Sequence, residues 1–338
     1  MTAPWAYPPA GRFDEHVLDS QALRDNPLGD PHERPLWVYV PPGYEADGER
    51  RYPAVYVIQG YTGQLDMWRN RAPFGAQTYP ELADELFASG EAPPCVVVWV
   101  DAWTSLGGSQ FLDAPAIGRY HTYLCEELVP WVDERYRTLA EPAHRGIQGK
   151  SSGGYGAMVT AMLRPDLFGG LATHAGDALF EACYAKDFPE TARLLRDRYE
   201  GSFERFWEDF RSRPLVSKPG DHVLVNTWGM AMAYSEGELP FDSTGRLVPE
   251  VWERWLEWDP VRMVERHADA LRGMRAIYVD AGTSDEFYLD LGAEAFRREL
   301  ERIGVTEVRF ELFDGKHGGI TWRYPIALRY LVERLTPG

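Results

Sequence analysis

The segment from Gly149 to Gly154 constrains the folding of this chain more than any other stretch of its sequence. It reads Gly-Lys-Ser-Ser-Gly-Gly and carries the pattern G-x-S-x-G around Ser151. A serine in this pattern sits on a sharp strand-to-helix turn, and only small neighbours fit around its strained backbone. Residues 143–148 can supply the strand, and the small apolar residues 155–163 can supply the helix. The sequence therefore predicts a nucleophile elbow, which presents the Ser151 hydroxyl at the edge of a sheet.

Two further interpretations of this segment are open at this point. Gly149-Lys150-Ser151 matches the end of a phosphate-binding loop, but that motif requires a glycine where His144 stands. A glycine- and serine-rich turn without any chemistry is the simpler alternative, because five-residue patterns arise by chance. The rest of the chain has to decide between them.

Charge and length limit the partners of the protein. The chain has 338 residues and a formal net charge of −17. This charge argues against nucleic acid or an anionic membrane as a partner and favours neutral or cationic small molecules. The length suits a single domain over residues 1–338 that carries an insertion.

Neither a membrane span nor a secretion signal is visible in the sequence. No stretch approaches the ~20 apolar residues of a transmembrane helix, and Met1 to Trp5 lack the features of a signal peptide. Cys95, Cys125 and Cys183 are odd in number, lie far apart and fit no metal spacing. We therefore expect a cytoplasmic protein with free thiols, no metal and no cofactor.

Strands and helices alternate through most of the chain. Short runs rich in apolar residues predict strands at 36–40, 54–58, 95–100, 276–280 and 308–313, and the run at 54–58 is continuously apolar. Helical spacing predicts helices at about 119–137, 290–303 and 321–335. This alternation is typical of an α/β fold with a mostly parallel sheet flanked by helices.

The alternation breaks between residues 180 and 262. Phe203, Phe206, Trp207 and Phe210 fall at helical spacing, a second helix is expected near 251–256, and the only strand-like run is 223–225. We predict a mainly helical insertion, or cap, that lies over the active edge of the sheet. Trp228 and Tyr234, with Met230 and Met232 between them, are candidate substrate contacts; the alternative is that they only pack the insertion onto the core.

A histidine and an acid should follow the serine in chain order if the elbow is catalytic. A serine hydroxyl needs a neutral imidazole to take its proton, and a carboxylate must orient that imidazole. His317 lies in a glycine-flanked loop just after the strand 308–313, and His174 is its one competitor.

The acid has three candidates. Asp285 follows the strand 276–279 after a short glycine turn and is the first choice. Asp280, at the end of that strand, and Asp177 are the alternatives.

An ester-cleaving site also needs two backbone donors for the oxyanion. One should be the N–H of Ser152, which follows the nucleophile. The other should be the N–H of Tyr61, since Gly60 leaves room for it to point inward. The alternative is that Gly60 serves only a tight turn.

Several short segments together resemble one protein family. They lie at residues 38–44, 52–61, 108–111, 126–130, 164–168 and 282–287. With them the chain resembles the esterase D / enterochelin-esterase-like branch of the α/β-hydrolases, which includes S-formylglutathione hydrolases, feruloyl esterases and mycolyltransferases. The resemblance covers about residues 35–180 and 270–335. It implies Ser151, Asp285 and His317 as the triad, with Tyr61 and Ser152 as oxyanion donors. Gln59 stands where many members have histidine, and the insertion carries no family motif.

These observations predict a metal-free serine carboxylesterase that acts on small-molecule esters through an acyl-enzyme. An acyltransferase of the mycolyltransferase type is an alternative, in which an alcohol replaces water. A non-catalytic binding protein on the same scaffold is a second alternative, and it would be expected to lack a member of the triad. The acyl and alcohol groups and the oligomeric state are left open by the sequence.

Overall fold

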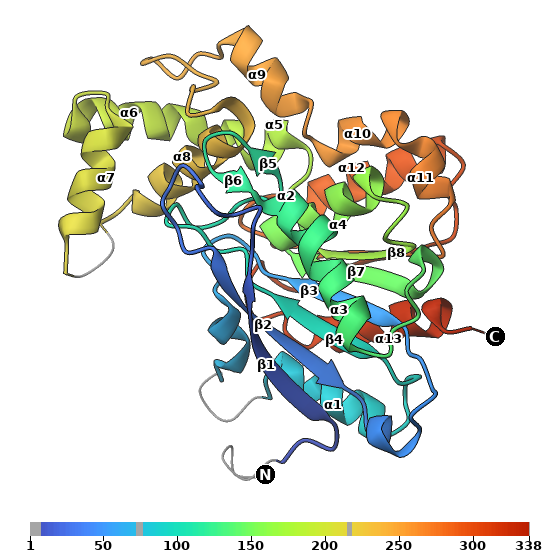
Figure 1. The fold of residues 1–338 in the computed structure, drawn as a ribbon. Coiled ribbons are helices and arrows are strands. Elements are labelled where there is room, and N and C mark those ends of the chain that lie inside the picture. Colours follow the sequence, from blue (N-terminus) through green and yellow to red (C-terminus); the bar gives the residue numbers. More distant parts are fainter. Residues whose placement is uncertain (1–7, 72–76, 215–217, 338) are drawn as a thin grey trace.

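An eight-stranded sheet runs through the middle of the molecule (Figure 1). The computed structural model describes residues 8–71, 77–214 and 218–337. In order across the sheet, the strands are β1 (Arg12–Asp19), β2 (Glu33–Val40), β4 (Val96–Val100), β3 (Ala54–Ile58), β7 (Arg145–Lys150), β8 (Gly170–His174), β9 (Ala276–Gly282) and β10 (Val308–Phe313). The pairs β1–β2 and β2–β4 are antiparallel, and the other neighbours are parallel. The predicted α/β fold with a mostly parallel sheet is confirmed.

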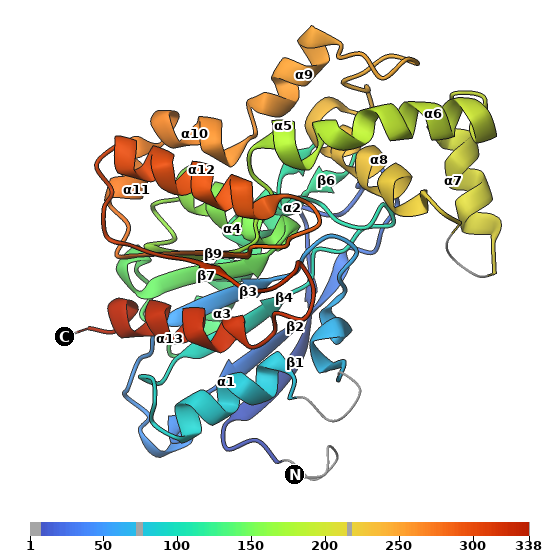
Figure 2. The same ribbon diagram turned by 180° about the vertical axis from the view of Figure 1, so that it is seen from behind.

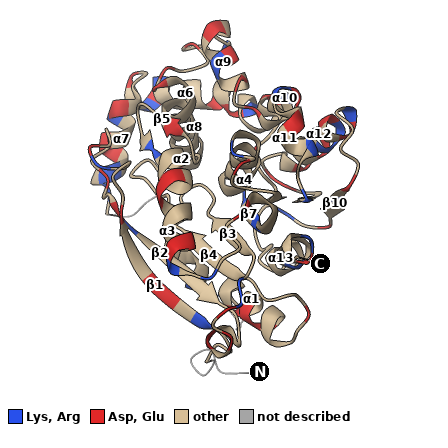
Figure 3. Cartoon of the chain, turned by 45° about the vertical axis from the view of Figure 1, so that its right-hand side comes forward, with Lys and Arg blue, Asp and Glu red and all other residues tan. Residues whose placement is uncertain are grey.

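Alternate residues of each central strand point to opposite faces of the sheet, and helices cover both faces. In β3, Val55 and Val57 pack toward α1 (Tyr79–Ala88) and α13 (Arg323–Leu335). Tyr56 and Ile58 belong to the larger core on the other face, beneath α3 (Val129–Arg135), α4 (Ser152–Leu163) and α12 (Leu289–Arg302). Figure 2 shows α1 and α13 on one side of the strands and α4 and α12 on the other. β3 and β4 carry no charged residue, whereas α7, α9 and α12 carry many (Figure 3).

Some elements differ from the sequence-based expectation. β1 was not predicted, because its sequence RFDEHVLD is largely polar; as an edge strand paired only with β2, it tolerates these side chains. The helix expected at 119–137 contains α2 (Tyr120–Thr122), a π-helical stretch (Tyr123–Leu128) and α3. A small hairpin, β5 (Asp113–Ala114) and β6 (Gly118–Arg119), precedes it.

A run of helices connects β8 to β9. These are α5 (Phe180–Cys183), α6 (Phe188–Tyr199), α7 (Phe203–Ser212), α8 (Asp221–Ser235), α9 (Pro249–Leu256), α10 (Pro260–Arg266) and α11 (Ala268–Arg272). The expectation of a strand-like run at 223–225 was wrong, since these residues lie in α8. A short apolar run does not distinguish a strand from a buried helix segment. Within the described residues, no helix has the length and apolar character needed to cross a bilayer.

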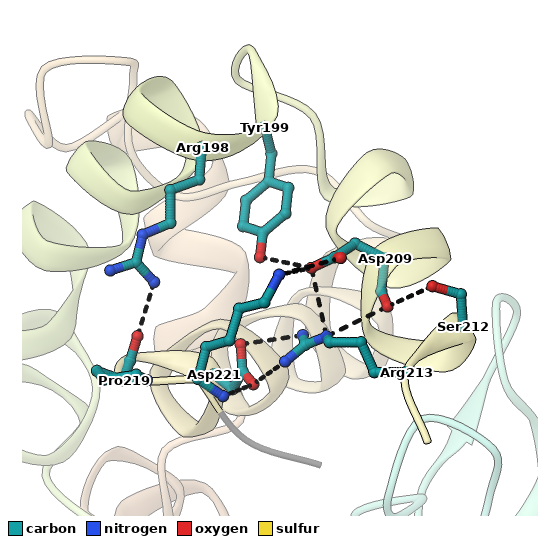
Figure 4. Close-up of polar contacts among 8 residues, drawn as sticks. Arg198, Tyr199, Asp209, Ser212, Arg213, Pro219 and Asp221 are labelled. Atoms are coloured by element: carbon teal, nitrogen blue, oxygen red, sulfur yellow. Dashed lines mark hydrogen bonds and ion pairs between the residues drawn. The ribbon is translucent and has the colours of Figure 1, made fainter. Parts of the chain in front are cut away.

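The helices α6, α7 and α8 project away from the sheet (Figure 1) and hold together through their own contacts. Their apolar cluster includes Tyr199, Phe206 and Leu224. Beside it, Arg213 donates two hydrogen bonds to Asp221, at 2.7 and 3.2 Å. Asp209 accepts from Tyr199 Oη at 3.0 Å, so one polar network joins all three helices (Figure 4).

We expect Asp221→Ala to loosen this projection. The change leaves the Arg213 guanidinium, whose side chain is only 12% exposed, without its bidentate partner. Breaking a pair of this kind costs about 3 kcal/mol. Thermal unfolding and hydrogen exchange of α7 and α8 measure the effect. Asp197→Ala removes an exposed partner of Arg196 and serves as the control, with an unchanged melting temperature. Equal melting temperatures for the two variants would contradict the prediction.

Candidate active site

Ser151 occupies a strained turn between β7 and α4. Its backbone angles are φ 58° and ψ −129°, a region that side-chain-bearing residues rarely adopt. Close backbone packing fixes this turn: a Cβ on Gly149 would lie 2.3 Å from the carbonyl oxygen of Gly153. The N–H of Ser151 donates to the carbonyl of His174 at 3.0 Å. The G-x-S-x-G segment therefore has the strand–turn–helix geometry expected of it.

The structure brings Ser151, His317 and Asp285 together, although they are far apart in the sequence. His317 Nε2 lies 3.1 Å from Ser151 Oγ, and His317 Nδ1 lies 2.8 Å from Asp285 Oδ2. Asp285 Oδ1 accepts the N–H of Phe287 at 2.8 Å, and the Asp285 side chain is fully buried. The N–H of His317 donates to Glu286 at 3.0 Å. Both the ring and its loop are thus held in place beside the serine.

The loop after β3 passes directly beside the elbow. A Cβ on Gly60 would lie 3.0 Å from the carbonyl oxygen of Lys150 and 3.4 Å from Ser151 Cβ, so a side chain there would have to push the elbow back by a few tenths of an ångström. Within the described residues, the N–H of Tyr61 has no acceptor. Ser152 begins α4, where backbone N–H groups lack partners inside the helix. Both donors expected from the sequence therefore belong to segments that border Ser151.

A cavity of about 510 Å³ opens next to Ser151 and His317. The helix α8 contributes His222, Val225 and Asn226 to its wall. Their spacing of three and four residues places them on one face of the helix. These three residues were not predicted as site residues, because the short apolar run 223–225 resembles a strand in the sequence.

Trp228 and Tyr234, the predicted substrate contacts, do not line this cavity, which corrects the expectation. Trp228 stacks on Phe203 with ring centroids 4.8 Å apart. Tyr234 is buried, and its hydroxyl accepts from Gln110 at 3.0 Å. Both lie on other faces of α8, and the sequence carried no information about the rotation of this helix.

Asp177, a minor candidate for the acid, contacts Ser152 rather than His317. Its Oδ2 accepts from Ser152 Oγ at 2.9 Å and from Tyr184 Oη at 2.8 Å. Burial raises the pKa of Asp177, and these hydrogen bonds act in the opposite direction. Its position in the cavity wall makes it part of the site.

His174, the competitor of His317, and Asp280, the competitor of Asp285, form a second histidine–aspartate pair that lies away from the serine hydroxyl. His174 Nδ1 lies 2.7 Å from Asp280 Oδ1, and both side chains are fully buried. The Gln148 amide donates to the carbonyl of Tyr324 and to His174 Nε2, both at 3.0 Å, so the hydrogen-bond pattern assigns the ring proton to Nδ1. Asp280 Oδ2 accepts from Arg323 at 2.7 Å.

Neither a metal cluster nor a reactive thiol is evident in the described part of the chain. It contains no group of three or more His, Cys, Asp or Glu residues placed to hold a metal ion. Cys95, Cys125 and Cys183 are free and buried. Cys183 borders the cavity, and burial raises the pKa of its thiol, which disfavours the thiolate.

Solved esterase structures share this fold. A ferulic acid esterase superposes with a TM-score of 0.63 at 21% identity, covering 97% of this chain and 100% of that chain. The S-formylglutathione hydrolase from Agrobacterium tumefaciens gives a TM-score of 0.58 at 19% identity and covers 98% of both chains. The likeness establishes the fold, which is that of an α/β-hydrolase.

The chain belongs to the family described as "Putative esterase", whose model matches residues 31–326. This confirms the resemblance seen in the sequence. An endo-1,4-beta-xylanase/feruloyl esterase of Xylanibacter ruminicola is 27% identical over 208 residues, which are 56% of this chain and 27% of that protein. An esterase of Mycobacterium tuberculosis is 28% identical over 145 residues, which are 42% of this chain and 28% of that protein. Across the first curated relatives, the chain spans 27% to 58% of their length.

We expect Asp280→Asn to lower the stability of the protein. Burial alone would raise the pKa of Asp280, but hydrogen bonds from His174 and Arg323 outweigh it and hold the pKa below its ordinary value. Removing the charge leaves Arg323 without its most buried partner, at a cost of about 3–5 kcal/mol. Denaturant titration at pH 7 measures this loss.

The matched control is Asp285→Asn, which removes a buried carboxylate that has no guanidinium partner. We expect this variant to lose less stability than Asp280→Asn.

The stability that Asp280 contributes should depend on pH. A carboxylate with a lowered folded-state pKa contributes stability above its unfolded pKa of ~3.9, and this contribution disappears as the pH falls through the folded value. The gap between wild type and Asp280→Asn should therefore narrow in acid. A gap that widens in acid would show that the carboxylate of Asp280 is not the stabilising group.

Proposed function

We propose that this protein is a serine carboxylesterase with Ser151 as nucleophile, His317 as general base and acid, and Asp285 as the residue that orients His317. The observation that carries the proposal is the continuous chain of contacts from Asp285 through both nitrogens of His317 to Ser151 Oγ, at 2.8 and 3.1 Å. These residues come from the ends of three different strands, β7, β9 and β10. Membership of an esterase family supports the same reaction class.

The reaction proceeds in two steps. Ser151 Oγ attacks the ester carbonyl while His317 Nε2 takes its proton, and Asp285 stabilises the resulting imidazolium. The N–H groups of Tyr61 and Ser152 bind the oxyanion of the tetrahedral intermediate. The intermediate collapses, the alkoxide leaves with the proton from His317, and the acyl group remains on Ser151. Water then attacks the acyl-enzyme by the same route and releases the acid.

A small-molecule ester is the substrate class that fits the cavity. Its volume of about 510 Å³ lies in the range of small-ligand sites. Two structural neighbours are a ferulic acid esterase and a feruloyl esterase module complexed with sinapinate. Both names refer to aromatic acids, so esters of aromatic acids are candidate substrates here. A complete histidine–acid–serine chain argues against a non-catalytic binding protein.

We expect Ser151→Ala to lose on the order of 10⁶ in turnover of 4-nitrophenyl esters, because the nucleophile is gone. Asp285→Asn should lose about 10⁴, since the imidazole then takes the wrong tautomer. Initial rates measure both, and circular dichroism checks the fold. A fluorophosphonate should label wild type and Ser152→Ala at Ser151. Labelling at Ser152 in the wild type would move the nucleophile by one residue.

We also propose that α8 takes part in acyl selection through His222, Val225 and Asn226. Asn226→Leu exchanges a polar wall group for an apolar one. We expect it to change the order in which acyl groups rank by kcat/KM, with changes of ~1–3 kcal/mol between acyl groups of adjacent size. Rates over a series of 4-nitrophenyl esters of increasing acyl length measure the ranking.

Trp228→Ala is the matched control on the same helix. Since Trp228 stacks on Phe203 and does not line the cavity, this variant should have a lower melting temperature and keep the wild-type ranking of acyl groups. If Trp228→Ala alters the ranking and Asn226→Leu leaves it unchanged, the assignment of the cavity wall is wrong.

A further inference from the structure

Lys150 is a charged residue of the cavity wall to which the proposed mechanism gives no role. It is the last residue of β7 and directly precedes Ser151. Its side chain is half-buried, and it borders the same cavity as Ser151 and His317. Any group bound at this point lies close to the reacting ester.

The chain has four lysines, and Lys150 differs from the other three. Lys186 pairs with Asp187 at 2.8 Å, Lys218 with Asp209 at 2.9 Å, and Lys316 with Glu286 at 3.7 Å. Among the described residues, the ammonium of Lys150 has neither a hydrogen bond nor an ion pair. An ammonium without a partner is unusual in a chain with 52 acidic residues.

The carboxylates that act on Lys150 are already engaged elsewhere. They are Asp285, Asp177 and Glu286. Asp285 is bound to His317 and Phe287, and Asp177 accepts from Ser152 and Tyr184. Glu286 accepts the N–H of His317. None of them is free to move to Lys150 without breaking a contact of the site.

Burial lowers the pKa of Lys150, and the three carboxylates oppose this shift without forming a contact. A half-buried ammonium that has lost water and gained no partner is held at a cost. An anionic ligand would remove this cost by supplying a charge-assisted hydrogen bond. The overall charge of −17 repels anions at long range, so this local cation would have to account for any preference for them.

We propose that Lys150 binds an anionic group of the substrate, such as a carboxylate or phosphate, so that the enzyme prefers esters that carry negative charge near the scissile bond. This proposal rests on the proposed esterase function. It makes Lys150 a specificity-determining residue, and the reaction at Ser151 stays the same.

Two pairs of esters test the proposal. In the first pair, 4-acetoxybenzoate is anionic and its methyl ester is neutral. Hydrolysis of the acetyl ester in either compound leaves the carboxylate, or its methyl ester, on the alcohol side. 4-Nitrophenyl hydrogen adipate and 4-nitrophenyl methyl adipate place it on the acyl side. For each pair, the ratio of kcat/KM for the anionic over the neutral ester is measured in wild type, Lys150→Met, Lys150→Arg and Lys186→Met.

In at least one pair, we expect Lys150→Met to lower this ratio by about 10- to 100-fold, the worth of a hydrogen bond to a charged group. The pair affected identifies the side of the ester that carries the anion. Lys150→Arg should keep most of the ratio. Lys186→Met removes the same charge from a residue outside the cavity and should change the ratio less than about twofold.

An unchanged ratio in both pairs would overturn the proposal. If kcat/KM then falls equally for the anionic and the neutral esters, Lys150 acts on the triad instead of on the charge of the substrate. If Lys150→Met does not fold, Lys150→Gln replaces it. If the proposed esterase function itself is wrong, the result will be different: the wild type will hydrolyse neither ester of either pair. Calorimetric titration of wild type and Lys150→Gln with 4-acetoxybenzoate then decides on Lys150, and equal affinities would refute its role.

Discussion

The contact between α4 and the centre of the sheet is the constraint on which the rest of the site depends. A Cβ on Gly153 would lie 2.6 Å from the carbonyl oxygen of Ile58, and one on Gly149 would meet the backbone of Gly153. Strand and helix can approach this closely only when both segments lack side chains at the crossing. The approach forces Ser151 into a strained conformation with positive φ, which costs about 1–3 kcal/mol. Burial of nearly all of α4 offsets that cost, so the strained serine is the consequence of a well-packed helix.

The same sheet contains two histidine–aspartate pairs, and their positions along the strands give them different roles. His174 and Asp280 lie within β8 and β9, where both are fully buried and Arg323 of α13 neutralises the acid. His317 and Asp285 lie beyond the ends of β10 and β9, where the ring reaches Ser151. The first pair still serves the second, because the carbonyl of His174 holds the N–H of Ser151. Identical residue types thus act as a structural support inside the sheet and as a proposed catalytic pair at its edge.

The sequence was informative where local patterns and chain order decide the structure. It predicted the strand-to-helix turn at Ser151, the apolar strands and the position of His317 after the last strand. β1 could not be predicted, because an edge strand needs few apolar residues. The face of α8 that meets the cavity could not be predicted either. Because α8 is apolar nearly all round, its sequence does not show whether Trp228 or Asn226 faces the cavity. The packing of Trp228 against Phe203 decides it. The proposed role of Lys150 was also hidden, since an ammonium without a hydrogen-bond or ion-pair partner is recognised only in the folded structure.

Tyr61 connects α8, which borders the cavity beside Ser151, to the loop that contains the proposed oxyanion donor. Its hydroxyl contacts the carbonyl of Val225 in α8 at 2.8 Å, and a Cβ on Gly229 would lie 2.1 Å from that hydroxyl. The ring therefore occupies a space that exists only because α8 has a glycine there. The backbone N–H of Tyr61 lies in the loop that borders Ser151, so this side chain ties the proposed donor to α8. The position of α8 and the position of the proposed oxyanion donor are therefore linked through the side chain of Tyr61.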